Sequence, residues 1–133
     1  MAVVVDASAL IAVVFGEPEK PAVQARLPPT GLISTALLPF EVANAAVQKV
    51  RRGLLTSGEA DAAMAVFVTM PIDLHPVPPE ALPALARAAR LTAYDAGYLW
   101  LARELKADLV TLDSALEKAW IKDKTDDGET NSD

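Results

Sequence analysis

Residues 2–8 read Ala-Val-Val-Val-Asp-Ala-Ser, and this stretch decides the fold. Four apolar residues in a row, three of them valine, predict a short strand buried on both faces, because β-branched side chains favour strands. Asp6 ends that strand, and a helix is expected from about Ser8 to Phe15, where Gly16 and Pro18 break it. The stretch therefore predicts a strand that leads directly into a helix, with a carboxylate at the carboxyl end of the strand.

Further short apolar segments alternate with helical segments along the chain. Strands are predicted at residues 32–34, 72–77 and 109–112, and helices at residues 20–26, 35–52, 56–69, 79–90, 92–106 and from 114 onward. Thr35 is the expected cap of its helix, while Thr56 with Glu59 and Ser114 with Glu117 have the form of a capping box. Short buried strands separated by helices form parallel sheets covered on both faces. We therefore expect a single α/β domain with a mainly parallel central sheet flanked by helices in three layers.

The composition excludes several classes of protein. The chain has 133 residues, 52% of them hydrophobic, and no cysteine, so it can bury a core without disulfides and has no thiolate for catalysis or zinc binding. It has neither the basic start of a signal peptide nor a run of the ~20 apolar residues that a membrane helix needs. These features lead us to expect a cytoplasmic protein that does not act at a membrane.

The acidic residues are concentrated at the end of the chain. Residues 122–133 contain five acidic residues, two lysines and no apolar residue to bury, so we expect a disordered acidic tail after a domain at residues 1–121. The tail carries a charge of −3, and the total of −6 leaves −3 for the domain. If bound cations neutralise four carboxylates of the domain, its remaining charge is near +1. The charge therefore permits an RNA partner without predicting one.

Four acidic residues are expected to converge at one edge of the predicted sheet. Asp6 and Asp113 follow the first and last strands, while Glu41 and Asp95 lie near the starts of two helices. In parallel α/β sheets the ligand crevice lies beyond the carboxyl ends of the strands, and helices that leave those strands begin at the same edge. Clustered carboxylates repel one another unless a cation holds them. Oxygen ligands without His or Cys indicate a hard cation, Mg²⁺ or Mn²⁺.

Each of these acids also has a structural interpretation when it is taken alone. Asp6 can cap the helix that follows, Asp95 is the third helical residue after a threonine cap, and Asp113 precedes a helix whose dipole favours an acid. Glu41 is the hardest to explain this way, because its neighbours are apolar. The set of four together is what indicates a metal site.

The order of the motifs resembles PIN-domain ribonucleases, of the small single-domain kind called VapC in toxin–antitoxin pairs. The resemblance runs from Val3 to about Trp120. The motifs that carry it are Val-Asp-Ala-Ser-Ala-Leu at Asp6, Glu-Val-Ala-Asn at Glu41, Leu-Thr-Ala-Tyr-Asp-Ala-Gly-Tyr-Leu at Asp95 and Thr-Leu-Asp-Ser-Ala-Leu at Asp113. The resemblance implies that these four acids are catalytic and bind the metal.

Three further residues are assigned supporting roles. Ser8 matches the hydroxyl position of the family, which implies that it holds a metal-bound water. Asn44 lies one helical turn after Glu41, and Thr111 lies two residues before Asp113, so both are candidates to support the site. Their structural alternatives are a helix cap for Ser8, a hydrogen bond to its own helix or a neighbour for Asn44, and an ordinary strand position for Thr111.

The resemblance implies a Mg²⁺- or Mn²⁺-dependent endoribonuclease that leaves a 3′-hydroxyl and a 5′-phosphate. It also implies a cognate antitoxin protein and a homodimer. Two alternatives within this fold stay open, namely a catalytically silent module that binds RNA or protein, and a PIN nuclease of RNA processing that has no antitoxin.

Two other folds gather acids at strand ends, and both fit the sequence less well. A response-regulator receiver needs a phosphate-accepting aspartate in mid-chain and a lysine after a late strand, but Asp73 lies inside a strand pattern and no Lys-Pro follows residues 109–112. A haloacid-dehalogenase-like phosphatase needs an aspartate two residues after Asp6, where this chain has Ser8.

The remaining polar signals are weaker. His75 is interpreted as a strand or turn residue, because the metal-dependent route needs no histidine. Six basic residues are candidates for phosphate contacts or, alternatively, for an ordinary solvated surface. They are Lys49, Arg51, Arg52, Arg87, Arg90 and Arg103.

Overall fold

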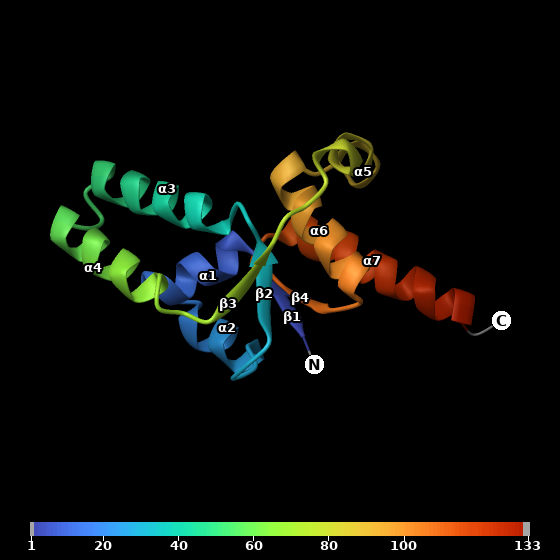
Figure 1. Cartoon of the computed structure of the whole chain (residues 1–133), viewed down its shortest axis with the longest axis horizontal. Helices are drawn as coiled ribbons and strands as arrows, with labels where there is room; N and C mark the ends of the chain where they lie inside the picture. Colours follow the sequence, from blue (N-terminus) through green and yellow to red (C-terminus); the bar gives the residue numbers. More distant parts are fainter. Residues whose placement is uncertain (1, 132–133) are drawn as a thin grey trace.

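The computed structural model describes residues 2–131, with side chains described to residue 126. Its sheet has four parallel strands in the order β3-β2-β1-β4 across the described residues. The strands are β1 (Val3–Val5), β2 (Leu32–Thr35), β3 (Ile72–His75) and β4 (Asp108–Val110). Figure 1 shows this sheet between two layers of helices, which confirms the predicted three-layer α/β/α domain.

The helices divide into two groups by the face of the sheet that they cover. One face is covered by α1 (Ala7–Val14), α2 (Lys20–Arg26), α3 (Leu38–Arg51) and α4 (Ser57–Phe67). The other face is covered by α5 (Leu82–Ala89), which follows the short 3₁₀ helix η1 (Pro79–Ala81), and by α6 (Ala93–Leu105) and α7 (Ser114–Asn131). In the part of the chain that the structure describes, no helix is long and apolar enough to cross a membrane.

The strand register brings the carboxyl ends of three strands to one edge. Val5 of β1 is aligned with Val110 of β4, and the backbone N–H of Asp6 donates to the carbonyl of Val110 at 3.1 Å. On the other side of β1, the hydroxyl of Ser34 in β2 donates to the carbonyl of Val5 at 2.7 Å. The residues that follow these three strands therefore leave the sheet at the same edge.

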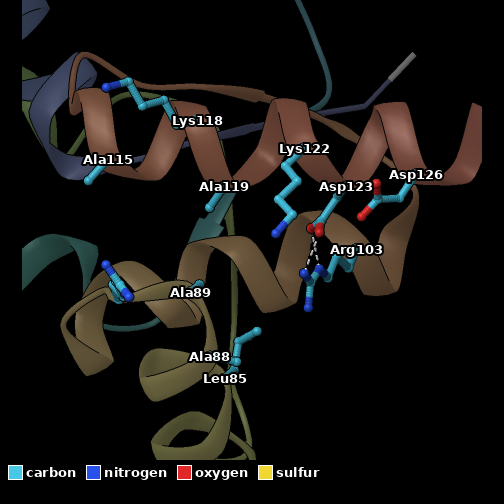
Figure 2. Close-up of a pocket in the computed structure, with 11 residues that line it drawn as sticks. Leu85, Ala88, Ala89, Arg103, Ala115, Lys118, Ala119, Lys122, Asp123 and Asp126 are labelled. Atoms are coloured by element: carbon cyan, nitrogen blue, oxygen red, sulfur yellow. Dashed lines mark hydrogen bonds and ion pairs between the residues drawn. The ribbon is translucent and has the colours of Figure 1, made fainter.

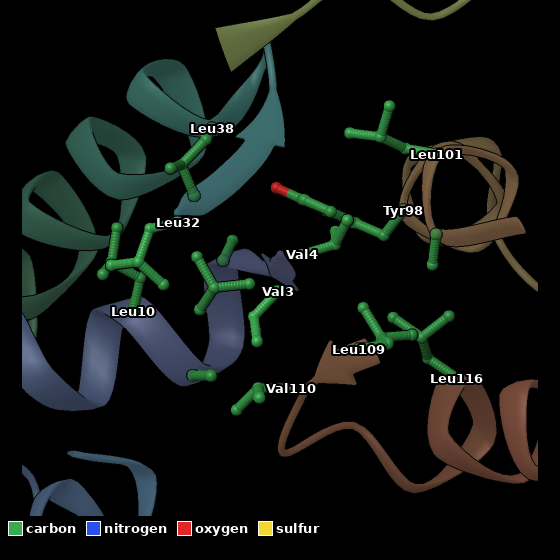
Figure 3. Packing of buried hydrophobic residues seen from close by; sticks show 14 of the residues in the cluster. Val3, Val4, Leu10, Leu32, Leu38, Tyr98, Leu101, Leu109, Val110 and Leu116 are labelled. Atoms are coloured by element: carbon green, nitrogen blue, oxygen red, sulfur yellow. The ribbon is translucent and has the colours of Figure 1, made fainter. Parts of the chain in front are cut away.

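The core packs against both faces of β1, as a strand of consecutive valines requires. Figure 3 shows Leu10 and Leu38 on one side of this strand, and Leu101 and Leu116 on the other. All four side chains are buried, as is Val4 between them. The two helix layers are thus fixed to the central strands, and the positions of their amino-terminal ends are fixed with them.

The starts of two helices differ from the prediction. Thr35, the expected cap, is the buried last residue of β2, and α3 begins three residues later at Leu38, with a proline in its first turn. Proline fits there because its missing N–H is not needed in the first turn. At α7 the cap is Asp113, whose Oδ1 accepts from the N–H of Leu116 at 2.8 Å, so Ser114 is the first helical residue instead of a capping-box residue. The capping box of Thr56 with Glu59 is confirmed.

The acidic tail also differs from the prediction over its described part. Residues 122–131 continue α7 as a helix, and residues 132 and 133 lie outside the described residues. Arg103 of α6 forms two hydrogen bonds with Asp123, and the ammonium of Lys124 lies 4.5 Å from the centre of the Trp120 ring. These contacts hold the first turn of the tail, and composition alone does not reveal them because their partners lie elsewhere in the fold.

Candidate active site

Asp6 is the most deeply placed of the four acids, with only 2% of its surface exposed. Its Oδ1 accepts from the N–H of Ala9 at 3.0 Å, so it caps α1, and from the hydroxyl of Ser8 at 2.8 Å. Its Oδ2 accepts from the hydroxyl of Thr111 at 2.5 Å. Donors from the start of α1 and from the segment after β4 therefore fix the orientation of this carboxylate.

Ser8 and Thr111 also join Asp6 to the loop that carries Asp113. The hydroxyl of Ser8 accepts from the N–H of Leu112 at 2.9 Å, and that of Thr111 accepts from the N–H of Asp113 at 3.0 Å. The two hydroxyl oxygens are 3.3 Å apart. Asp113 in turn caps α7 through Leu116. The structure thus brings Asp6, Ser8, Thr111 and Asp113 into one hydrogen-bonded group at the sheet edge.

Glu41 reaches the same edge from the first turn of α3 and is held by a residue that the sequence reasoning missed. Its Oε1 accepts from the phenol of Tyr98 at 3.2 Å, and Tyr98 is almost fully buried in α6. A usable signal was present in the spacing, because Tyr98 lies three residues after Asp95 and so on a neighbouring position of the same helix surface. Tyr98 therefore links the α3 side of the site to the α6 side.

Asp95 lies in the first turn of α6 and is partly buried. Its backbone N–H donates to the hydroxyl of Thr92 at 3.2 Å, which confirms the threonine cap expected from the sequence. The amino-terminal end of a helix favours negative charge. The placement of Asp95 therefore follows from local helix chemistry and does not need a metal to explain it.

The electrostatics show that the four carboxylates act on one another. Burial raises the pKa of Asp6, and its hydrogen bonds oppose that rise. Burial raises the pKa of Glu41 to about 7, against the hydrogen bond from Tyr98 and with smaller contributions from the charges of Asp6 and Asp95. The pKa of Asp95 rises through burial and the charge of Asp113. In the described part of the chain no lysine or arginine forms an ion pair with any of the four.

The donor chemistry fits a hard divalent cation, but the side chains do not form a closed cage. Among the described residues, no three acidic or histidine groups stand close enough together to hold one ion as they are. Mg²⁺ usually retains several waters and uses only one or two carboxylates of the protein. The four acids, all of them oxygen donors without a basic partner, suit that mode of binding. The assignment of all four as metal ligands stays a prediction.

A pocket of about 620 Å³ opens in front of part of the site. Glu41, Asn44 and Asp95 line it, whereas Asp6 and Asp113 do not. The rings of Phe40 and Tyr94 also line it, with 73% and 61% of their surfaces exposed. Phe40 directly precedes Glu41, and Tyr94 directly precedes Asp95, so an exposed ring accompanies each of the two acids that face the pocket.

The other predicted residues are accounted for as follows. Asn44 lies at the pocket as expected, on the helix of Glu41. His75 belongs to β3, where its ring nitrogen lies 3.0 Å from the carboxylate of Asp73 in the same strand, which agrees with a structural role. Ser8 and Thr111 both contact Asp6 directly. Neither has the structural role given as its alternative, because Asp6 itself caps α1 and β4 ends at Val110, one residue before Thr111.

Comparisons with known proteins agree on the family and the fold of this chain. The family model described as PIN domain matches residues 3–121. Among solved structures, PAE2754 from Pyrobaculum aerophilum is similar with a TM-score of 0.71 and 26% identity, over 90% of this chain and 79% of that chain. VapC20 (Rv2549c) from Mycobacterium tuberculosis, a sarcin–ricin loop cleaving toxin, is similar with a TM-score of 0.59 and 17% identity, over 89% and 95% of the two chains, which is a likeness of fold alone. The search of curated proteins found no match.

The raised pKa of Glu41 predicts how the stability of the metal-free protein depends on pH. Between its ordinary value of 4.5 and about 7, the folded protein holds a proton that the unfolded chain releases, so the free energy of unfolding falls as pH rises through this window. Glu41→Gln retains the shape and cannot ionise. We expect it to melt higher than wild type at pH 8, by roughly 1 kcal/mol or about 4 °C after discounting for solvent screening.

The measurement is a melting curve in EDTA from pH 4 to pH 9. Glu104→Gln on the exposed side of α6 is the matched control, and it is expected to follow wild type. A Glu41→Gln protein that melts below wild type at pH 8 contradicts the raised pKa of Glu41 on which this expectation rests.

Proposed function

The chain belongs to the PIN domain family, whose members are generally nucleases, and from this premise we propose that it is a Mg²⁺- or Mn²⁺-dependent endoribonuclease. The observation that carries the proposal is the set of four carboxylates at one sheet edge. Burial, and to a smaller extent the charges of neighbouring acids, raise the pKa values of Asp6, Glu41 and Asp95, and none of the four has a basic partner in the described chain. A purely structural acid would normally be paired or exposed. A buried acid, Asp6, with three partly buried acids around it and no basic partner, instead suits the binding of cations.

In the proposed reaction, Asp6, Glu41, Asp95 and Asp113 would supply the oxygen ligands of the divalent ion, with waters of the ion completing its coordination. When it is bound, the ion lowers the pKa of a coordinated water and stabilises charge on the phosphate and the leaving oxygen. Ser8 and Thr111 hold the carboxylate of Asp6 in one orientation. Tyr98 donates to one oxygen of Glu41, and its own pKa is raised by burial and by that carboxylate, so it stays a neutral donor at working pH.

The two exposed aromatic rings of the pocket support RNA as the substrate. The exposed rings of Phe40 and Tyr94 lie beside the two acids that face the pocket, where unstacked bases can stack on them. Such stacking requires single-stranded or loop regions. Hydrolysis through a positioned water is proposed to leave a 3′-hydroxyl and a 5′-phosphate. The fold shared with VapC20, a toxin that cleaves the sarcin–ricin loop, supports an RNA loop as one class of target.

A protein partner is also part of the proposal. The chain is proposed to be the toxin of a toxin–antitoxin pair and to form a homodimer. Exposed apolar side chains on α3, on α4 and in the segments that follow these two helices offer apolar surface for such contacts, and exposed apolar surface of this kind commonly serves association. They are Val47, Leu54, Val66 and Val68.

The decisive test is cleavage of a mixed, structured RNA pool by purified protein with Mg²⁺, Mn²⁺ or EDTA. We expect metal-dependent cutting that falls to the EDTA background in Asp6→Asn and Asp95→Asn. Asparagine retains the shape of aspartate and is an equally good helix cap, so the fold is expected to persist. Asp61→Asn on the exposed surface of α4 is the control and is expected to cut like wild type.

Two outcomes contradict parts of this proposal. Cleavage that persists in Asp95→Asn removes Asp95 from the mechanism. No cleavage with either ion, combined with no divalent-ion binding by calorimetry, favours the catalytically silent binding module.

Thr111 gives a test of metal binding that does not depend on activity. Thr111→Val retains the shape but loses the hydroxyl that contacts Asp6 and Asp113, whereas Thr111→Ser retains it. We expect Thr111→Val to bind Mn²⁺ about 10- to 100-fold more weakly in titration calorimetry, since loss of a group that orients a ligand typically has this effect. Thr111→Ser is expected to bind like wild type. Equal affinities of all three proteins contradict a role for Thr111 in orienting Asp6.

The two exposed rings predict a loss of substrate binding. Phe40→Ala with Tyr94→Ala is expected to raise KM for single-stranded RNA by about 10-fold or more, because stacking on one aromatic side chain contributes about 1–3 kcal/mol per base. The rate at saturating RNA is expected to change little. Val66→Ala with Val68→Ala removes exposed apolar surface from the α4 side and is the matched control. If both double variants raise KM equally, the rings are not a specific binding site for bases.

A further inference from the structure

A second pocket lies away from the four acids. It has a volume of about 890 Å³ and is formed by α5, α6 and α7. Figure 2 shows small side chains such as Ala89 and Ala119 facing one another across it, with charged side chains at its rim. We call this pocket the α5–α7 groove.

One end of the α5–α7 groove adjoins the candidate active site. Its lining includes Arg90, two residues before the Thr92 cap of the Asp95 helix, and Ala115, two residues after Asp113. Its other end is marked by Arg103 near the end of α6 and by its partner Asp123. The groove therefore leads from the acids along the length of α6 and α7.

The rim of the groove carries unbalanced positive charge. Lys118, Lys122 and Arg90 are exposed, and none of them forms an ion pair within the described residues. Arg103, by contrast, is bound to Asp123. Figure 2 shows Lys122 reaching from α7 across the groove towards α6. The lining as a whole holds four basic residues against the two acids Asp123 and Asp126. Even in a chain with a net charge of −6, this local excess of positive charge favours an anion.

The spacing of these cations suits a chain of phosphates. Lys118 and Lys122 are four residues apart on α7, about 6 Å along the helix axis. In Figure 2 the side chain of Lys122 extends towards α6, whereas that of Lys118 lies along the side of α7 away from α6. Arg90 is the carboxyl-terminal cap of α5, with a left-handed φ of 58°, and stands at the end near the acids. The apolar part of the lining consists of four alanines and Leu85.

The three basic residues at the end of α3 lack these properties. Lys49 lies 3.7 Å from the carboxylate of Glu17 and 5.6 Å from the centre of the Phe15 ring, so its charge is paired within the chain. Arg51 and Arg52 end α3, at the opposite end of that helix from Glu41 and in the other helix layer. Of these two groups of basic residues, the one around the α5–α7 groove adjoins the candidate active site.

We propose that the α5–α7 groove binds the single-stranded RNA beyond the scissile bond, with backbone phosphates on Arg90, Lys118 and Lys122 and the sugars against the alanines of its lining. The proposal rests on the proposed ribonuclease function, since it names how the same substrate is held. It assigns these three side chains to positioning the strand and not to catalysis.

The test measures the salt dependence of RNA binding with cleavage blocked. Every protein carries Asp95→Asn, Mg²⁺ is present, and binding of a fluorescent single-stranded 12-nucleotide RNA is followed by anisotropy between about 50 and 300 mM KCl. Each phosphate contact to a single strand contributes about 0.7 to the slope of log K against log salt. Lys118→Gln with Lys122→Gln is expected to reduce that slope by about 1.4 and to weaken binding several-fold at low salt.

Arg51→Gln with Arg52→Gln is the matched control, because it removes the same charge from the other helix layer. We expect its slope to equal that of the parent protein. If the two double variants reduce the salt slope equally, only long-range charge acts, and RNA binding by the groove is contradicted. An unchanged slope in the lysine variant also contradicts it.

A lysine variant that loses self-association in sedimentation velocity assigns the groove to a second copy of the chain instead.

A separate readout distinguishes failure of the groove from failure of the proposed function. Cleavage of the RNA pool is compared for wild type and for the lysine variant with Asp95 intact. A raised KM with an unchanged kcat is the result expected of lost strand binding. If wild type does not cleave at all, the nuclease proposal fails, while the salt slopes still decide whether the groove binds RNA.

Discussion

The gathering and partial burial of four carboxylates at one edge of a parallel sheet is the constraint that shapes the candidate site. The register of β1 against β4 places Asp6 beside the segment of Thr111 and Asp113. The packing of α3 against α1, and of α6 against β1 and β2, brings Glu41 and Asp95 to the same edge. In the folded chain part of this charge is offset by helices. All four acids lie at the cap or in the first turn of a helix, where the dipole and the free N–H groups favour negative charge. The fold that brings the acids together thus also places helix amino-terminal ends beside them, and these ends partly offset their negative charge.

This arrangement makes the structural and the chemical interpretations of the acids compatible. Asp6 and Asp113 each cap a helix through one carboxylate oxygen, as their sequence positions suggest. The caps fix where each carboxylate points, which is what a ligand for a hard cation requires. Helix capping cannot account for the raised pKa of Glu41, since burial causes most of it and the nearest donor, Tyr98, only partly opposes it. The free-energy cost of ionisation that helix capping does not explain therefore lies mainly with Glu41. This is also the acid that is hardest to assign a structural role from the sequence.

Much of this could be predicted from the sequence, and the failures have identifiable physical causes. Runs of valine and leucine between helical segments give the parallel sheet, and the rule that its carboxyl edge carries the site gives the convergence of Asp6, Glu41, Asp95 and Asp113. Local patterns failed where tertiary contacts decide. Thr35 is a good cap by type, but pairing with β3 retains it in the sheet. Tyr98 looks like a core residue of α6 until the approach of α3 puts Glu41 within reach of its phenol. The helix through Lys122 and Asp123 depends on Arg103, a partner 20 residues earlier in the chain.

The distribution of charge is also decided by the tertiary structure and not by composition alone. A net charge of −6 argues against an anionic ligand only if the charge is spread evenly, and the structure shows that it is not. One helix layer presents exposed apolar side chains on α3 and α4, whereas the other presents Arg90, Lys118 and Lys122 around the α5–α7 groove. The four acids lie between these two surfaces. At a Debye length of about 8–10 Å, a phosphate at the groove responds chiefly to the cations beside it and only weakly to the total charge. The acidity of the chain as a whole and a basic path next to its acidic centre are therefore compatible, because each acts over a different distance.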